Sequence, residues 1–169
     1  MLEKERNAVK VKSDFITNSS SSSFIVAFDK LPETVDEMVA LLFDEGQVEY
    51  ENPYKFSDAD PSGWSTSEVG AFVLNNTKVA EKTEIEDEAI NLIDLEWDGF
   101  TDKNGKMDWN KYRKEETRLL DIKVDEIIRD MKNKFICIYE FSDNDGKFYS
   151  ALEHGDLFRR LQHIKISKH

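Results

Sequence analysis

Residues 134–153, with the sequence KFICIYEFSDNDGKFYSALE, join an apolar run to a turn sequence and a second, alternating run. The first run is rich in β-branched and aromatic residues, which fit a pleated sheet. The Asp, Asn and Gly residues between the runs favour a tight turn, because they tolerate the left-handed backbone region. We therefore predict a β-hairpin with strands at residues 135–141 and 148–152. Apolar side chains alternate onto both faces of the first strand, which is typical of a central strand.

The last residues of the chain, 163–169, read HIKISKH and predict a terminal edge strand, because apolar and polar side chains alternate. All three histidines lie in the C-terminal part of the chain. If this strand pairs beside the hairpin, five potential metal ligands converge: Asp143, Asp145, Glu153, His154 and His163. Carboxylates and imidazoles are the ordinary ligands of zinc and other divalent ions. Turn carboxylates and solvated histidines are nevertheless the commoner explanation of such residues.

The composition is that of a folded, acidic protein. Of the 169 residues, 39% are hydrophobic and 11% aromatic, which suffices for one domain with a substantial core. The net charge of −12 argues against binding to a nucleic-acid backbone, which requires clustered Lys and Arg, and permits a basic partner or a bound cation. The chain has no long apolar segment and no signal-type N-terminus, so we expect no membrane association and a cytoplasmic location.

Cys137 is the only cysteine and lies inside the first predicted strand of the hairpin. A single cysteine excludes an intramolecular disulfide and any metal site built on several thiolates. We expect a buried thiol that behaves as a small apolar side chain.

Five consecutive serines, at residues 19–23, precede an apolar pentad at residues 24–28 that predicts a strand. Serine favours turns, because its hydroxyl competes for backbone hydrogen bonds. We therefore expect a hydrogen-bonded turn or bulge before the strand. The alternative is an anion-binding turn, in which backbone amides and hydroxyls surround an anion; it would use Asn18, Ser19, Ser20 and Ser21.

The segment DFITNSSSSSFIVAF resembles an N-terminal signature, DF(V/I)TNSSSSSF, found on small bacterial and phage proteins without an assigned activity. The stretches FSDNDGKFYSALEHG and HIKISKH resemble the C-terminal parts of some of those proteins. The resemblance implies a bacterial or phage origin. It implies no activity, so no site residue is transferred from it.

Capping-box sequences predict three helix starts in the middle of the chain: Thr34 with Glu37, Ser65 with Glu68, and Thr83 with Glu86. Apolar residues follow each one at helical spacing. The third predicted helix carries a negative outer face, which includes Glu84, Asp87, Glu88 and Asp94. This face could contact a basic partner, although a solvated helix face is the commoner explanation.

Residues 98–112, DGFTDKNGKMDWNKY, have the composition of a calcium-binding loop. Aligning Gly105 with position 6 of an EF-hand places Asp102 and Asp108 at ligand positions. Positions 1 and 12 are then Phe100 and Lys111, where the motif requires carboxylates. We therefore expect an ordinary Asx/Gly loop.

Further apolar stripes, at residues 109–120 and 124–131, predict helices that lead into the hairpin. One early strand, a helix-rich middle and extended C-terminal segments predict a single α+β domain over residues 1–169, with residues 1–13 frayed. The sheet is expected to be mostly antiparallel and covered by the helical middle. Residues 24–28 should pair with the hairpin and place Ile25 beside Ile138.

The chain contains no motif for nucleotide, phosphate or nucleophilic chemistry. We therefore predict a non-enzymatic, acidic interaction protein that engages another protein, a host protein if the chain is phage-encoded. The alternative is a small metal-dependent hydrolase or metal-binding domain that uses the C-terminal carboxylates and histidines.

Overall fold

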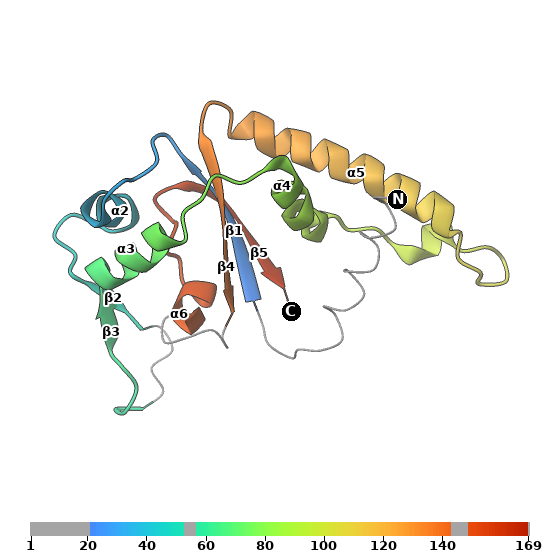
Figure 1. Ribbon diagram of the computed structural model, residues 1–169. Coiled ribbons are helices and arrows are strands. Elements are labelled where there is room, and N and C mark those ends of the chain that lie inside the picture. The colour runs from blue at the N-terminus through green and yellow to red at the C-terminus, as the bar shows by residue number, and fades with distance from the viewer. Residues whose placement is uncertain (1–20, 53–56, 143–148, 169) are drawn as a thin grey trace.

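The computed structural model describes residues 21–52, 57–142 and 149–168 (Figure 1). Its centre is an antiparallel sheet in the order β4-β1-β5, formed by β1 (Ser21–Phe28), β4 (Phe135–Ser142) and β5 (Gln162–Lys168). Ile25 lies opposite Ile138 on one side and Ile164 on the other. The predictions of an α+β fold, a mostly antiparallel sheet and an early strand paired with residues 135–141 are confirmed.

The central strand is β1, and the prediction that residues 135–141 form a central strand is wrong. Seven of the eight β1 residues are buried, because both neighbouring strands and both faces of the sheet cover them. β4 is an edge strand, and Phe135 and Glu140 on it are exposed. Its apolar side chains reflect cover on both faces, which an edge strand also receives when helices pack against each side of the sheet.

The second strand of the predicted hairpin is also wrong, because Tyr149–His154 form the helix α6. Ser, Ala, Leu and Glu in this stretch are compatible with a helix, and an apolar run this short does not distinguish a strand from a helix. The outer edge of β4 receives another segment instead. Val79 forms a bridge with Cys137, and the Ala80 backbone N–H donates to the Ile136 carbonyl at 2.8 Å. The predicted turn, residues 143–148, lies outside the described residues.

Two cores lie on opposite faces of the sheet. On one face, Phe24, Val26 and Phe28 pack against α2 (Val35–Leu42), α3 (Thr66–Asn75) and α6. On the other face, Ile25 and Ala27 pack against α4 (Lys82–Ala89) and α5 (Trp109–Asp130). Figure 1 shows α2, α3 and α6 on one side of the strands and α4 and α5 on the other. A small hairpin of β2 (Glu49–Glu51) and β3 (Gly63–Ser65) lies beside α3.

Two of the three predicted helix starts are confirmed. The Thr34 hydroxyl accepts the Glu37 N–H at 3.2 Å, and Ser65 and Glu68 form a complete capping box. The third is wrong, because α4 begins two residues before the predicted start. Glu84 accepts the Glu81 backbone N–H at 2.7 Å and caps the helix from its own first turn. The sequence offers two overlapping capping boxes, Glu81 with Glu84 and Thr83 with Glu86, and α4 begins at the first.

Candidate interaction surface

The most exposed aromatic residues of the described chain lie on an extension of the fold, residues 96–118, which we call the arm. It contains the short helix η2 (Trp97–Phe100), a loop, and the first ten residues of α5. α5 joins the two helical stripes that the sequence predicted, and its buried residues, Val124 and Ile127, lie in its second half. In Figure 1 the first half of α5 extends away from the sheet, with η2 beside its end.

The loop of the arm is a tight turn built on Asp102. Its carboxylate accepts the backbone N–H groups of Asn104 at 2.8 Å and Lys106 at 2.9 Å. Gly105 adopts a φ of 76°, the left-handed region that favours glycine. The Asp108 carboxylate accepts the Lys111 N–H at 3.0 Å and caps α5. The loop is therefore an Asx turn with a glycine in the left-handed region, in agreement with the predicted Asx/Gly loop.

Four aromatic rings pack together where η2 meets the start of α5. The Trp97 ring meets Trp109 edge-on at 5.5 Å and Tyr112 at 5.8 Å, and Phe100 meets Tyr112 at 5.3 Å between centroids. These distances are those of favourable aromatic pairs. Burial in this cluster, with a contribution from Glu116, raises the pKa of Tyr112. The cluster is nevertheless open to solvent, because Trp97 remains 57% exposed and Trp109 48% exposed.

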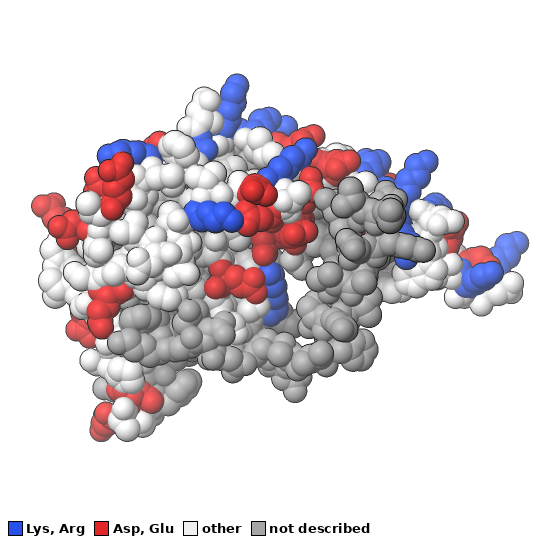
Figure 2. Space-filling model, viewed as in Figure 1, with Lys and Arg blue, Asp and Glu red and all other residues white. Residues whose placement is uncertain are grey.

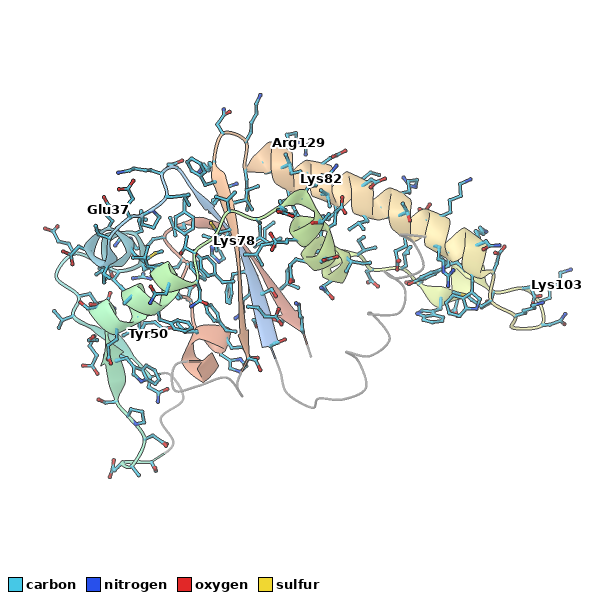
Figure 3. The ribbon with its side chains drawn as sticks, in the orientation of Figure 1. Glu37, Tyr50, Lys78, Lys82, Lys103 and Arg129 are labelled. Carbon is cyan, nitrogen blue, oxygen red and sulfur yellow. The ribbon has the colours of Figure 1, made fainter. Side chains whose placement is uncertain are left out.

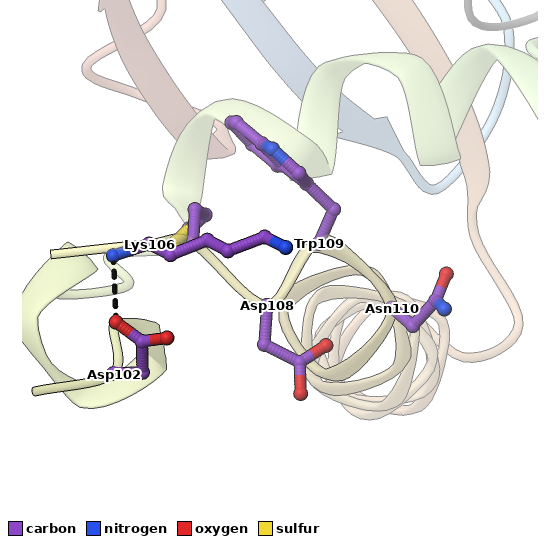
Figure 4. Close-up of a pocket in the computed structure, with 6 residues that line it drawn as sticks. Asp102, Lys106, Asp108, Trp109 and Asn110 are labelled. Carbon is purple, nitrogen blue, oxygen red and sulfur yellow. Dashed lines mark hydrogen bonds between the residues drawn. The ribbon is translucent and has the colours of Figure 1, made fainter. Parts of the chain in front are cut away.

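An open hollow of about 420 Å³ adjoins the aromatic cluster. Residues of the loop and the first turn of α5 line it (Figure 4): Asp102, Lys106, Met107, Asp108, Trp109 and Asn110. In Figure 4 the Trp109 indole and the Asp108 carboxylate point to opposite sides of the helix start. Lys111 lies over the Phe100 ring at 5.8 Å, and Figure 3 places Lys103 at the outer end of the loop. The hollow thus offers apolar and charged groups side by side.

The charge of the chain is unevenly distributed. Residues 21–95 contain 17 acidic and four basic residues, a net charge of −13, whereas the arm contains six of each sign. Figure 2 shows carboxylates gathered over α4 and, at the far right, side chains of both signs on the arm. The sequence as a whole is acidic because of its first half, and the arm is neutral by count.

Two of the four residues predicted for the acidic face, Glu84 and Glu88, make contacts within the molecule. Glu84 accepts the Glu81 backbone N–H, which lowers the pKa of its carboxyl, and it also lies 3.5 Å from the Lys78 ammonium. Glu88 pairs with Lys168 of β5 at 3.0 Å, and its side chain is only 12% exposed. Asp87 and Asp94 are exposed. Glu84 and Glu88 are thus engaged within the chain, whereas Asp87 and Asp94 lie at exposed positions.

Two of the five predicted metal ligands, Asp143 and Asp145, lie outside the described residues. Glu153 is fully buried, and neither carboxylate oxygen has a hydrogen-bond partner among the described residues. The His154 Nε2 lies 3.5 Å from Glu153, and the His163 Nδ1 lies 2.9 Å from the Leu161 carbonyl oxygen. Within the described ranges, no three His, Cys, Asp or Glu side chains are close enough to hold a metal ion.

Only one of the four residues of the predicted anion-binding turn lies among the described residues. Asn18, Ser19 and Ser20 lie outside the described residues, while Ser21 is the first residue of β1. Ser22 and Ser23 continue the strand and are buried. The turn or bulge predicted for Ser21 and the following serines is therefore wrong, because these residues pair with β4 and β5 from the first residue of the strand.

The aromatic cluster of the arm was not predicted from the sequence. Its signal is a pair of aromatic residues three apart in each element, Trp97 with Phe100 and Trp109 with Tyr112. Residues three apart share one face of a helix, so each pair forms an aromatic face. The same spacing is typical of a core-facing helix, so the pattern alone does not reveal that the rings are exposed.

Comparison with protein-family models, with curated proteins and with solved structures found no match to this chain. The N-terminal resemblance to bacterial and phage proteins therefore stays a prediction. In the part of the chain that the structure describes, no helix is both long enough and apolar enough to cross a bilayer.

Proposed function

We propose that this protein is a non-enzymatic interaction protein that binds another protein through the aromatic cluster of the arm. The observation that carries the proposal is the exposure of Trp97 and Trp109 at one end of the molecule, away from both cores. Tryptophan is enriched among the residues that contribute most to protein–protein binding. Keeping two tryptophans about half exposed leaves apolar area in water that a partner could cover.

The geometry around the cluster supports a protein as the partner. Basic and acidic side chains, including Lys106 and Asp108, surround the exposed rings and the adjoining hollow. An apolar centre with a charged rim is the usual anatomy of a protein-binding surface. The neutral charge of the arm distinguishes it from the acidic α4 face, which could contact a basic partner. Asp87 and Asp94 remain available there as secondary contacts.

The proposed bacterial or phage origin makes a bacterial lysate the appropriate source of partners. The immobilised full-length chain and the double variant Trp97→Ala/Trp109→Ala should be compared with Val48→Ala, which removes an exposed apolar side chain (77% exposed) elsewhere. We expect the wild type and Val48→Ala to retain the same protein and the double variant to lose it. Retention of an identical set of proteins by all three would refute the role of the arm.

A further inference from the structure

We propose that β5 is a second interaction surface, where an extended acidic segment of a partner protein adds to the edge of the sheet. β5 borders the sheet on the side opposite β4 and pairs, among the described strands, with β1 alone (Figure 1). It has seven residues and is about 23 Å long, so its outer edge can hold a short strand. This edge shares no residue with the arm, and the inference does not depend on the proposed function.

The direction of the backbone groups of β5 follows from the register of the sheet. The Ala80 N–H donates to the Ile136 carbonyl from outside the sheet, so the backbone groups of Ile136 point away from β1. This direction alternates along a strand, so the backbone groups of Cys137 point toward β1, and the unbroken register carries the alternation across β1 to β5. On β5 the backbone groups that point out of the sheet are those of His163, Lys165 and Ser167.

The two outer edges of the sheet differ in their cover. On β4, the bridge between Val79 and Cys137 occupies part of the edge. On β5, none of the described segments pairs with the outer edge, and the side chains of Lys165 and Ser167 are exposed. An unpaired edge of this length is a template for a further strand. Addition of an extended peptide to such an edge is a recurring mode of peptide recognition.

The charge of this part of the chain favours an acidic occupant. Residues 157–169 contain four basic residues and no acidic ones, in a chain of net charge −12. Three of the four basic residues pair with carboxylates of the described chain: Arg159, Arg160 and Lys168. Lys165 makes no ion pair within the described ranges, and its ammonium lies over the Phe24 ring at 5.5 Å. An unpaired positive charge therefore lies at the middle of the open edge.

Lys165 also argues against the two occupants that the chain itself offers. A second copy whose β5 lies antiparallel across a two-fold axis at Lys165 brings its own Lys165 directly opposite. The alternating segment at residues 8–12, AVKVK, brings Lys10 and Lys12. Like charges opposite each other in a sheet are destabilising, whereas a carboxylate opposite a lysine is stabilising. Lysine on an edge strand prevents pairing between like edges, so Lys165 selects an acidic strand from another protein.

The two faces of β5 define the pattern of the occupant. Ile164 and Ile166 lie on the face that α4 and α5 cover, and Lys165 lies on the opposite face. Lys168, on the same face as the two isoleucines, already pairs with two carboxylates, so this face offers no further unpaired cation. The occupant that fits alternates apolar residues, which lie beside the isoleucines, with acidic residues, which lie beside Lys165.

Fluorescence anisotropy of labelled peptides of the same length as β5, titrated with the full chain, tests the inference. The peptide VEVEVEV should bind with a dissociation constant below about 1 mM, and VKVKVKV should bind at least tenfold more weakly. Lys165→Glu should reverse this preference, whereas Lys132→Glu, at an exposed position after α5, should leave it unchanged. Absence of VEVEVEV binding at about 1 mM overturns the inference. Equal binding of the two peptides by the wild type overturns it as well.

Methylation of the peptide backbone tests strand addition without any change to the protein. One form of VEVEVEV carries N-methyl groups on its Glu amides, and the other carries them on its Val amides. Because the N–H groups of an added strand point alternately toward and away from β5, only one form should lose binding at least tenfold. Loss in the Glu form indicates an antiparallel strand, and loss in the Val form indicates a parallel one. Equal loss or equal retention overturns strand addition.

The other occupants give different results. If VEVEVEV binds only to the full-length variant Val9→Pro/Val11→Pro, the N-terminal segment of the chain occupies the edge. If the full chain self-associates in sedimentation equilibrium and the peptide dissociates it, the occupant is a second copy. Either result overturns the inference. Trp97→Ala/Trp109→Ala should bind the peptide as the wild type does, so failure at β5 leaves the proposed function of the arm untouched.

Discussion

Gly70 offers the sharpest test of how tightly the helices that cover the first core are packed. It lies inside α3, where α3 contacts α2, and it is buried. A Cβ added at this position would lie 2.7 Å from the Cγ2 of Val39, far inside ordinary van der Waals distance, whereas the nearest backbone atoms are 3.6 Å away. The obstacle is therefore one methyl group. Val39 gives way with difficulty, because a β-branched side chain in a helix has one strongly preferred rotamer.

Two opposing effects decide the result of Gly70→Ala. Replacing glycine by alanine inside a helix stabilises the fold by about 1 kcal/mol. Forcing an extra methyl into a packed contact costs about 1–3 kcal/mol. We expect the second effect to dominate, with a net loss of about 1 kcal/mol in the free energy of unfolding. In a Val39→Ala background the obstructing methyl is absent, so the same substitution should stabilise by about 1 kcal/mol.

Urea unfolding followed by far-ultraviolet circular dichroism measures all four members of this cycle. The expected coupling between the two positions is about 2 kcal/mol, well above the error for residues in contact. The m-value should stay the same in all four proteins, so that changes in midpoint report stability. If Gly70→Ala stabilises the wild type as much as the Val39→Ala variant, α2 and α3 do not pack as closely as described, and the reasoning is refuted.

Three further predictions concern the sheet. Burial raises the pKa of the Cys137 thiol from 9.0 to about 11, so the folded state keeps the thiol proton to a higher pH than the unfolded state does. The free energy of unfolding should therefore fall by up to about 2–3 kcal/mol between pH 9 and 11. Urea unfolding across that range measures the fall, which should be smaller in Cys137→Ala. Tyr139→Phe removes a 2.7 Å hydrogen bond to the Thr77 hydroxyl and should cost about 1 kcal/mol in the same assay, whereas equal stability would show that the bond contributes nothing. Removing residues 1–28 deletes β1, the strand between β4 and β5, so the shortened chain should show no cooperative thermal transition; an unchanged transition would contradict the topology.

The sheet was largely predictable because its signals are local and strong. The apolar runs around Ile25 and Ile138 are too β-rich for any other assignment, and their pairing follows once each needs a neighbour. The identity of the central strand was not predictable. The sequences of β1 and β4 both indicate a strand buried on both faces, so they do not show which of the two is central. The strand order depends on β5, which pairs with β1 on the side opposite β4. The stretch around Leu152 was too short to show its helical character.

The arm was not predictable because its exposure depends on dimensions rather than on residue types. The axes of three paired strands span only about 10 Å, since neighbouring strands lie about 4.8 Å apart. The buried residues from Val124 of α5 to Met131 at its C-cap span eight residues, also about 10 Å, while the whole helix is about 33 Å long. Among the residues that the structure describes, a sheet this narrow leaves the first half of α5 without cover. The sequence of α5 shows an apolar face, but only the width of the sheet determines how much of it is buried.

The position of the arm beyond the sheet gives a test of whether the aromatic cluster contributes to stability or to binding. Truncating a buried core tryptophan costs about 3–5 kcal/mol, whereas the two arm tryptophans lie outside both cores. We expect Trp97→Ala/Trp109→Ala to lower the free energy of unfolding by less than about 1.5 kcal/mol. Trp64, which is only 8% exposed, still reports unfolding of the main body by fluorescence in this variant. A loss of 3 kcal/mol or more would show that the cluster stabilises the fold, and its exposure would then not indicate a binding surface.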